Sequence, residues 1–154
     1  MSIILRKAYS SDIQAIHQLI TPYAHEGLIL ERTEHEIGEF IDCFFIAQKT
    51  DSIIGVVSYY DYGPALKEIR SLAVKSELKS NGIGSMLVEK ITSHLGHKSS
   101  AKIFTLTYSP GFFEKNGFIE VPKESLPEKI WKDCMKCKHR ETCGETAMVY
   151  AKIS

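Results

Sequence analysis

The chain has 154 residues, of which 44% are hydrophobic and 25% charged, as is typical of one globular domain with its own core. Its 19 Lys and Arg residues balance its 19 Asp and Glu residues, so we expect no nucleic-acid partner and no membrane partner attracted by bulk charge. No apolar run approaches the length of a signal peptide or a membrane span, so we expect a cytoplasmic protein whose four cysteines are thiols or metal ligands.

The first half of the chain predicts a strand, two helices and three further strands. Ser11 and Gln14 have the spacing of a capping box at the start of the first helix. Thr33 and Glu36 repeat this spacing before the second, shorter helix. Two apolar runs on either side of the polar break Lys-Thr-Asp-Ser predict a β-hairpin. In chain order, these elements are expected over residues 1–9, 10–20, 33–41, 44–48, 53–62 and 68–74.

The second half predicts a longer helix, a strand, a short helix and two more strands. Ile83, Leu87 and Ile91 are spaced four apart, which places them on one face of the longer helix. Ser109 is the expected N-cap of the short helix, and Gly117 its end. In chain order, these elements are expected over residues 83–95, 101–108, 109–117, 118–121 and 145–153.

This order of elements predicts an α/β (α+β) fold over residues 1–154, a single domain with a mixed central β-sheet flanked by helices. The sheet should be antiparallel at first and parallel around the longer helix. A polar, cysteine-bearing loop is expected at about residues 122–145.

The stretch KSNGIGSMLVEK, residues 79–90, places Lys79, Gly82 and Gly84 directly before the longer helix. Glycine allows a tight turn and a close approach to the backbone, and the first turn of a helix carries unpaired N–H groups with partial positive charge. These features suit an anion such as a phosphate. The stretch by itself is equally compatible with a solvent-facing loop that caps the helix.

Two blocks of this sequence resemble the GNAT (GCN5-related N-acetyltransferase) superfamily. The family signature Arg/Gln-x-x-Gly-x-Gly/Ala stands here as Lys79-Ser80-Asn81-Gly82-Ile83-Gly84, after the strand EIRSLAV. The block LTYSPGFFEKNGF resembles the later strand–helix–strand element of that family. Lys79 keeps a cation at the position of the usual Arg or Gln but lacks the planar fork of a guanidinium.

The resemblance implies that acetyl-CoA is the co-substrate. The pyrophosphate would then lie against backbone N–H groups at the start of the longer helix. The pantetheine arm would pair with the preceding strand as an added strand does, although these strand residues would also serve as ordinary core. The residues implied are Leu72, Ala73, Val74, Lys79, Ser80, Asn81, Gly82, Ile83, Gly84 and Ser85.

Acetyl transfer to nitrogen needs a neutral amine, and therefore benefits from a general base. Glu68 opens the strand EIRSLAV where some family members carry that base, and Glu68 and Arg70 share one face by the period of two. The alternative is that Glu68 ends a solvent-facing strand or only pairs with Arg70. Phe112 and Phe113 stand where many relatives have a tyrosine acid, so Tyr108 is the substitute candidate, with simple packing as its alternative.

Residues 27–37, GLILERTEHEI, and the tail WKDCMKCKHRETCGETAM resemble short, single-domain bacterial N-acetylglutamate synthases. The resemblance implies a small-molecule amine as acceptor, such as the α-amine of glutamate or another amino acid. Arg32 would bind a carboxylate of that acceptor, and Arg70 is a second candidate cation. Alternatively, Arg32 is a surface residue that precedes a helix cap.

Cys134, Cys137 and Cys143 form the pattern C-x2-C-x5-C, with His139 between the last two. A structural zinc site usually takes four ligands as two pairs, whereas His139 follows Cys137 by only two residues and Cys43 is remote in sequence. We therefore favour thiols in a loop over the acceptor pocket, or a redox-sensitive pair, and do not favour zinc or any other metal.

Two other functions remain open at the level of sequence. One is a GNAT-fold enzyme that acetylates a protein N-terminus, a lysine or an antibiotic amine. The other is a non-catalytic sensor that binds acetyl-CoA or uses the cysteine tail as a metal or redox switch. A homodimer is compatible with the sequence, which does not determine the oligomeric state.

Overall fold

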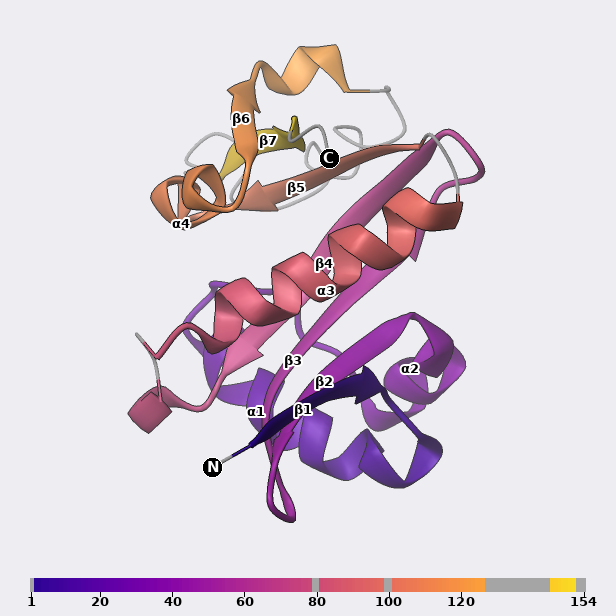
Figure 1. Cartoon of the computed structure of the whole chain (residues 1–154), viewed down its shortest axis with the longest axis vertical. Helices are drawn as coiled ribbons and strands as arrows, with labels where there is room; N and C mark the ends of the chain where they lie inside the picture. The colour runs from indigo at the N-terminus through magenta and orange to yellow at the C-terminus, as the bar shows by residue number, and fades with distance from the viewer. Residues whose placement is uncertain (1, 79–80, 99–100, 127–144, 152–154) are drawn as a thin grey trace. The chain divides into compact units, whose positions relative to one another are not determined.

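The computed structural model describes residues 2–78, 81–98, 101–126 and 145–151. The chain divides into two compact units, Met1–Ile103 and Phe104–Ser154 (Figure 1). The predicted strands and helices are all found, with shifted ends, and the expected α/β class is confirmed. No helix in the described part of the chain is long and apolar enough to cross a membrane.

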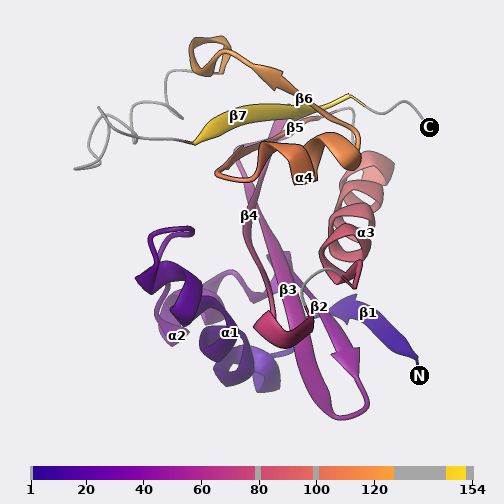
Figure 2. The same cartoon turned by 90° about the vertical axis from the view of Figure 1, so that its left-hand side faces the viewer.

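The first unit is an antiparallel sheet covered by helices on both faces. Strand β1 pairs with β2, β2 with β3, and β3 with β4, all antiparallel. Helices α1 and α2 lie on one face of these strands and α3 lies on the other (Figures 1 and 2). The elements are β1 (Ile3–Lys7), α1 (Ile13–His25), α2 (Glu34–Glu39), β2 (Phe44–Lys49), β3 (Ser52–Asp61), β4 (Leu66–Val74) and α3 (Ile83–Lys98).

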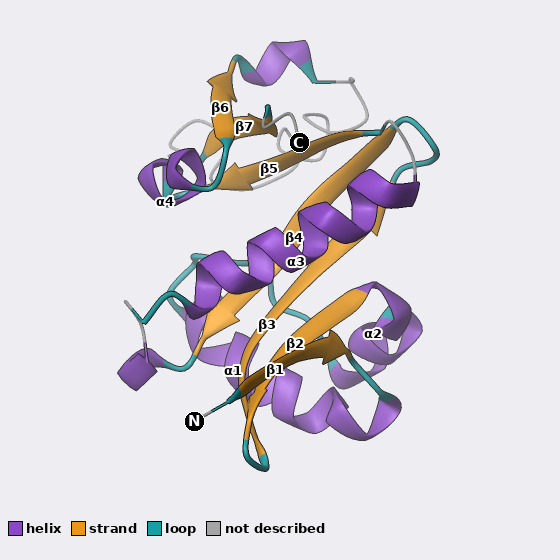
Figure 3. Ribbon diagram, in the orientation of Figure 1, coloured by secondary structure: helices purple, strands orange, loops and turns teal. Residues whose placement is uncertain are grey.

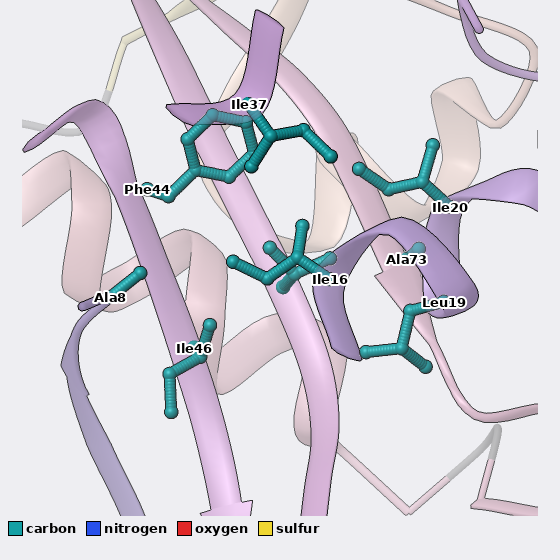
Figure 4. Packing of buried hydrophobic residues seen from close by; sticks show 9 residues of the cluster. Ala8, Ile16, Leu19, Ile20, Ile37, Phe44, Ile46 and Ala73 are labelled. Atoms are coloured by element: carbon teal, nitrogen blue, oxygen red, sulfur yellow. The ribbon is translucent and has the colours of Figure 1, made fainter. Parts of the chain in front are cut away.

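The core of this unit follows from the spacing of apolar residues along its helices and its strands. Helix α1 presents Ile16, Leu19 and Ile20 to the sheet, three and four residues apart, and all three are buried (Figure 4). Strand β2 contributes Phe44 and Ile46 to the same cluster, because alternate residues of a strand face one side. The other members of the cluster are Ala8, Ile37, Val56 and Ala73.

The start of α1 differs from the sequence prediction. A short 3-10 turn, Ser10–Asp12, precedes the helix, and no capping box between Ser11 and Gln14 is formed there. Instead, the carboxylate of Asp12 accepts the backbone N–H of Tyr9 at 2.7 Å and two hydrogen bonds from Arg6 at 2.8 and 3.2 Å. The partly buried salt bridge between Arg6 on β1 and Asp12 in this turn therefore fixes the start of α1. The local spacing of Ser11 and Gln14 could not reveal this contact.

The second predicted capping box is confirmed at α2. The Thr33 hydroxyl accepts the N–H of Glu36 at 3.1 Å, and the Glu36 carboxylate accepts the N–H of Thr33 at 2.9 Å. This reciprocal pair satisfies two N–H groups at the start of the helix. The capping box therefore fixes the C-terminal end of the connection between α1 and α2, which carries Arg32.

The second unit is a small antiparallel sheet with one helix (Figure 3). Strand β7 (Thr146–Tyr150) pairs with both β5 (Lys102–Thr107) and β6 (Phe118–Val121), and α4 (Pro110–Lys115) connects β5 to β6. Phe113 of α4 packs against Phe118 with ring centroids 5.2 Å apart. Ser109 makes no side-chain cap; its N–H donates instead to the Thr107 hydroxyl at 2.8 Å.

Candidate active site

The glycine-rich turn leads into α3 as the sequence predicted. Gly82 has φ +80°, a backbone conformation that residues with a Cβ rarely adopt. Its carbonyl accepts the N–H of Met86 at 3.0 Å. Ile83 and Gly84 are the first two helical residues, so their N–H groups have no acceptor within the helix. Of the residues predicted to hold the pyrophosphate, Lys79 and Ser80 lie outside the described residues.

A glycine that the sequence analysis did not identify sets how closely α3 approaches the sheet. A Cβ at Gly55 in β3 would lie 2.9 Å from Cδ1 of Leu87 and 3.1 Å from Cγ2 of Ile83. Both side chains are buried and belong to the first half of α3. Gly55 therefore allows the start of this helix to sit close against β3.

Strand β4 carries a bulge next to the residues predicted to bind pantetheine. Val56 pairs with Ala73 and Ser58 pairs with Arg70, so one residue of β3 opposes two residues of β4. Ser71, one of those two, is buried and has φ +53°. Such strained backbone persists where the surrounding structure holds it, and is common at functional sites. The bulge changes the direction of the backbone N–H and C=O groups where the segment predicted to bind pantetheine, Leu72 to Val74, begins.

Glu68 and Arg70 form the predicted pair, and a tyrosine completes it. Nε of Arg70 donates to Oε1 of Glu68 at 2.7 Å, and the Tyr62 hydroxyl donates to the same oxygen at 3.2 Å. Nη2 of Arg70 in turn donates to the Tyr62 hydroxyl at 2.8 Å. The three side chains thus form a closed hydrogen-bonded triangle, with all of its corners in the first unit.

The environment of Glu68 suits a proton acceptor. Glu68 is only 7% exposed, and this burial raises the pKa of its carboxyl group above the ordinary value for glutamate. The charge of Arg70 and the hydrogen bonds from Arg70 and Tyr62 act in the opposite direction. A carboxylate with a raised pKa is a stronger base than an exposed one, and the neighbouring cation favours its ionised form.

Arg32 lies in the same cluster. Burial lowers the pKa of its guanidinium, and so does the positive charge of Arg70, whereas Glu68 and Glu36 raise it. The distance from Arg32 Nη1 to Glu36 Oε2 is 4.0 Å, at the limit of an ion pair. The partly buried guanidinium groups of Arg32 and Arg70 and the buried carboxylate of Glu68 therefore act on one another electrostatically, and these two cations outnumber the one buried anion.

Three of the predicted residues, Arg32, Glu68 and Arg70, are thus brought together, whereas Tyr108 belongs to the second unit. Tyr108 follows β5 and is 42% exposed, and Phe113, at one of the positions where relatives carry an acid, is buried. The role of Tyr108 as a general acid stays a prediction. The residue that the sequence analysis missed is Tyr62, although the alternation in Tyr-Tyr-Asp-Tyr places Tyr60 and Tyr62 on one face, and Tyr60 pairs with Glu68 across the strands.

The predicted cysteine loop lies outside the described residues, and Cys134, Cys137, His139 and Cys143 with it. Among the residues that the structure does describe, no group of three or more His, Cys, Asp or Glu side chains could hold a metal ion. Cys43 is described, and burial raises the pKa of its thiol, so that it is a poor nucleophile.

The family of the chain is decided by comparison with known proteins. The family model of the acetyltransferase (GNAT) family matches residues 11–118. The chain belongs to the GNAT family. An N-acetyltransferase of Chlorobaculum tepidum is 41% identical over 145 residues, which are 94% of each chain. The resemblance seen in the sequence is therefore confirmed, and with it the reaction class of acetyl transfer.

More distant relatives are named amino-acid acetyltransferases. That of Mycobacterium tuberculosis is 29% identical over 83% of this chain and 75% of its own. That of Escherichia coli K12 is 29% identical over 80% of this chain, but only 28% of its own length is covered. This GNAT chain therefore spans little more than a quarter of the length of the longer relatives.

Solved structures agree with the fold. N-acetylglutamate synthase from Neisseria gonorrhoeae, complexed with coenzyme A and N-acetyl-glutamate, superposes with a TM-score of 0.86 and 25% identity, over 97% of this chain and 35% of that one. A Mycobacterium tuberculosis protein in complex with CoA superposes with a TM-score of 0.84 and 22% identity, over 97% and 99%. The GNAT fold predicted from the sequence is confirmed.

Proposed function

We propose that this GNAT protein transfers the acetyl group of acetyl-CoA to the α-amine of glutamate or of another amino acid, with Glu68 as the general base. The observation that carries the proposal is the buried Glu68 carboxylate beside the guanidinium groups of Arg70 and Arg32. A base and a surplus of positive charge in one place suit an acceptor that has both an amine and a carboxylate.

The acceptor would be oriented by charge. A carboxylate of the amino acid would pair with Arg32, whose guanidinium is half-buried and only weakly engaged by Glu36 at 4.0 Å. The charge of Arg70 adds to the attraction. A polyamine, by contrast, would bring further positive charge to a site that already carries an excess of it. The relatives named amino-acid acetyltransferases, and the N-acetylglutamate synthase structure that contains N-acetyl-glutamate, support the same acceptor class.

The chemical step follows from this placement. The lone pair of the neutral amine attacks the thioester carbonyl carbon, a C–N bond forms, and the amine proton passes to Glu68 directly or through a water. The C–S bond then breaks, and coenzyme A leaves as a thiolate. Because a thiol has a pKa of about 8.5, this leaving group departs without an obligatory acid. Tyr108 would therefore assist protonation of the thiolate and would not be essential for it.

Acetyl-CoA would be held by the elements described above. Backbone N–H groups at Ile83 and Gly84, together with the dipole of α3, suit the pyrophosphate. The backbone of β4 beyond the bulge suits the pantetheine arm. The solved GNAT structures that contain coenzyme A support this co-substrate.

An acceptor screen tests the proposal. Release of the coenzyme A thiol from acetyl-CoA would be followed with amino acids, polyamines and lysine-containing peptides as separate acceptors. Glutamate or another amino acid should give the highest kcat/KM, and mass spectrometry should identify the N-acetylated product. Turnover only with polyamines or peptides would refute the acceptor. Absence of thiol release with every acceptor, in protein that binds coenzyme A, would favour the sensor.

A further inference from the structure

The two hydrogen bonds to Glu68 converge on one of its oxygens. Arg70 and Tyr62 both donate to Oε1, at 2.7 and 3.2 Å, and no other residue among those described donates to Oε2. The Tyr62 hydroxyl accepts from Arg70 Nη2 at 2.8 Å, and it donates its own proton to Oε1 of Glu68, because an ionised carboxylate can only accept. The direction of every bond in the triangle is therefore fixed, and Oε2 is the oxygen left to accept a proton.

Arg70 is held in place from a second direction. Its guanidinium carbon lies 4.4 Å from the centroid of the Tyr60 ring and 5.8 Å from that of Tyr62. A stacked guanidinium cannot rotate in its plane without losing the bond to Glu68. Nε and Nη2 of Arg70 therefore both donate hydrogen bonds within the protein, whereas Arg32 contacts a carboxylate among the described residues only at 4.0 Å, in Glu36.

We infer that Arg70 and Tyr62 are positioning residues, which hold Oε1 of Glu68 so that Oε2 faces the acceptor amine. The inference rests on the proposed function, in which Glu68 is the base. In this inference Arg70 holds the base Glu68, and it does not bind the carboxylate of the acceptor.

Among the described residues, the charged and titratable groups that act on Glu68 come from three segments. They are Arg70 on β4, Tyr62 just beyond the end of β3, and Arg32 in the connection between α1 and α2. Burial raises the pKa of Tyr62 to about 12, and the charge of Glu68 contributes to this. Tyr62 therefore remains a proton donor at every pH at which the enzyme would be assayed, as a positioning role requires.

The substitution Tyr62→Phe removes one hydroxyl and keeps the ring. We expect kcat to fall about tenfold with the KM of the acceptor unchanged within about twofold, because a hydrogen bond to a charged group is lost at the base and not at the acceptor. The acidic limb of the kcat/KM profile should move to higher pH, since that bond lowers the pKa of Glu68. Tyr59→Phe is the matched control: the Tyr59 hydroxyl bonds Cys43, away from the triangle, and its profile should match wild type.

The substitution Arg70→Lys separates geometry from charge. Lysine keeps one positive charge but cannot donate to Oε1 and to the Tyr62 hydroxyl in the same fixed fork. We expect kcat to fall at least as far as in Tyr62→Phe, whereas Arg32→Gln should mainly raise the KM of the acceptor. The inference is overturned if Arg70→Lys raises this KM and leaves kcat intact, because Arg70 would then bind the acceptor.

A titration of the Glu68 carboxyl group tests the inference independently of turnover. The side-chain carboxyl of Glu68 can be followed by 13C NMR in protein labelled at glutamate, with its signal assigned by its loss in Glu68→Gln. Tyr62→Phe should raise the pKa of Glu68, and Tyr59→Phe should not; an unchanged pKa in Tyr62→Phe would overturn the inference. If Glu68→Gln retains full turnover, the proposed base and this inference fail together. If Glu68→Gln is inactive but Tyr62→Phe matches wild type in kcat and profile, only the inference fails.

Discussion

The hydroxyl of Tyr23 in α1 donates a hydrogen bond of 2.5 Å to the carbonyl oxygen of Val74, the last residue of β4. The residues are 51 apart in sequence, so this contact joins the helix that precedes Arg32 to the strand proposed to bind the pantetheine arm. Each carbonyl oxygen has two lone pairs, so Val74 could still accept a hydrogen bond from pantetheine.

Loss of the hydrogen bond between Tyr23 and Val74 should lower the stability of the protein. We expect Tyr23→Phe to lower the free energy of unfolding by about 1 kcal/mol, the usual worth of one hydrogen bond, and urea denaturation measures it. Tyr9→Phe is the control, because Tyr9 is exposed and its ring, which lies against Arg6, is retained. Equal stability of Tyr23→Phe and wild type would show that the contact contributes nothing to folding.

Gly55→Ala should separate acetyl-CoA binding from acceptor binding. The added methyl group would meet Leu87 at 2.9 Å and Ile83 at 3.1 Å, so α3 must shift away from β3 at a cost of about 1–3 kcal/mol. Since Ile83 also starts the helix, we expect the KM of acetyl-CoA to rise several-fold while that of the acceptor changes little. Steady-state kinetics with each substrate varied in turn measures both constants.

Gly96→Ala is the matched control for this change in the same helix. A Cβ at Gly96 meets nothing within 4 Å, and alanine is the better helix former by up to about 1 kcal/mol. This variant should be at least as stable as wild type, with both KM values retained. A KM of acetyl-CoA that rises equally in Gly96→Ala and Gly55→Ala would contradict the role given to Gly55.

Gly82→Ala tests the turn before α3. The site is spacious, since nothing lies within 4 Å of an added Cβ, but φ is +80°, where alanine is strained by about 1 kcal/mol. The strain falls on the residue just before the N–H groups proposed to bind pyrophosphate. We expect weaker binding of coenzyme A in calorimetry, with little change in the KM of the acceptor. Unaltered affinity would remove the turn from the binding site.

The salt bridge between Arg6 and Asp12 should make stability depend on pH. The hydrogen bond from Arg6 lowers the pKa of Asp12 below its ordinary value of 3.8, and the Tyr9 N–H adds to this. A lowered pKa in the folded protein stabilises it above pH 3.8, and this contribution is lost as the pH falls through the folded value. Asp12→Asn should therefore destabilise the protein at pH 7, by about 1–3 kcal/mol, and by less at pH 2.5, where part of this contribution is lost. Urea unfolding at both pH values gives the comparison; an equal loss at both would show that ionisation of Asp12 does not matter.

Local sequence rules predicted those parts of the molecule that depend on near neighbours. The capping box at Thr33 and Glu36 and the turn at Gly82 need only three to four residues of context, and both formed as expected. Glu68 and Arg70 were placed on one face by the period of a strand, and their 2.7 Å bond confirms this.

The remaining features depend on contacts between distant segments. Tyr62 joins the triangle through the pairing of β3 with β4, and the bulge at Ser71 shifts the register of that pairing. Gly55 matters only because α3 packs on it from more than 25 residues away. Asp12 caps its turn with the help of Arg6 on β1, so the local signal at Ser11 was misleading. Register and packing distance are properties of the folded sheet and leave little trace in a single sequence.

The most direct test of the account compares wild type with Glu68→Gln for turnover and for coenzyme A binding. Glutamine has nearly the shape of glutamate but cannot accept the amine proton. We expect acetylation of glutamate, or of the preferred amino acid from the screen, to fall at least about 100-fold at pH 7.5, while calorimetry gives the same affinity for coenzyme A in both proteins. Equal turnover in the two proteins would contradict Glu68 as the base, and the absence of coenzyme A binding by wild type would contradict the proposed function.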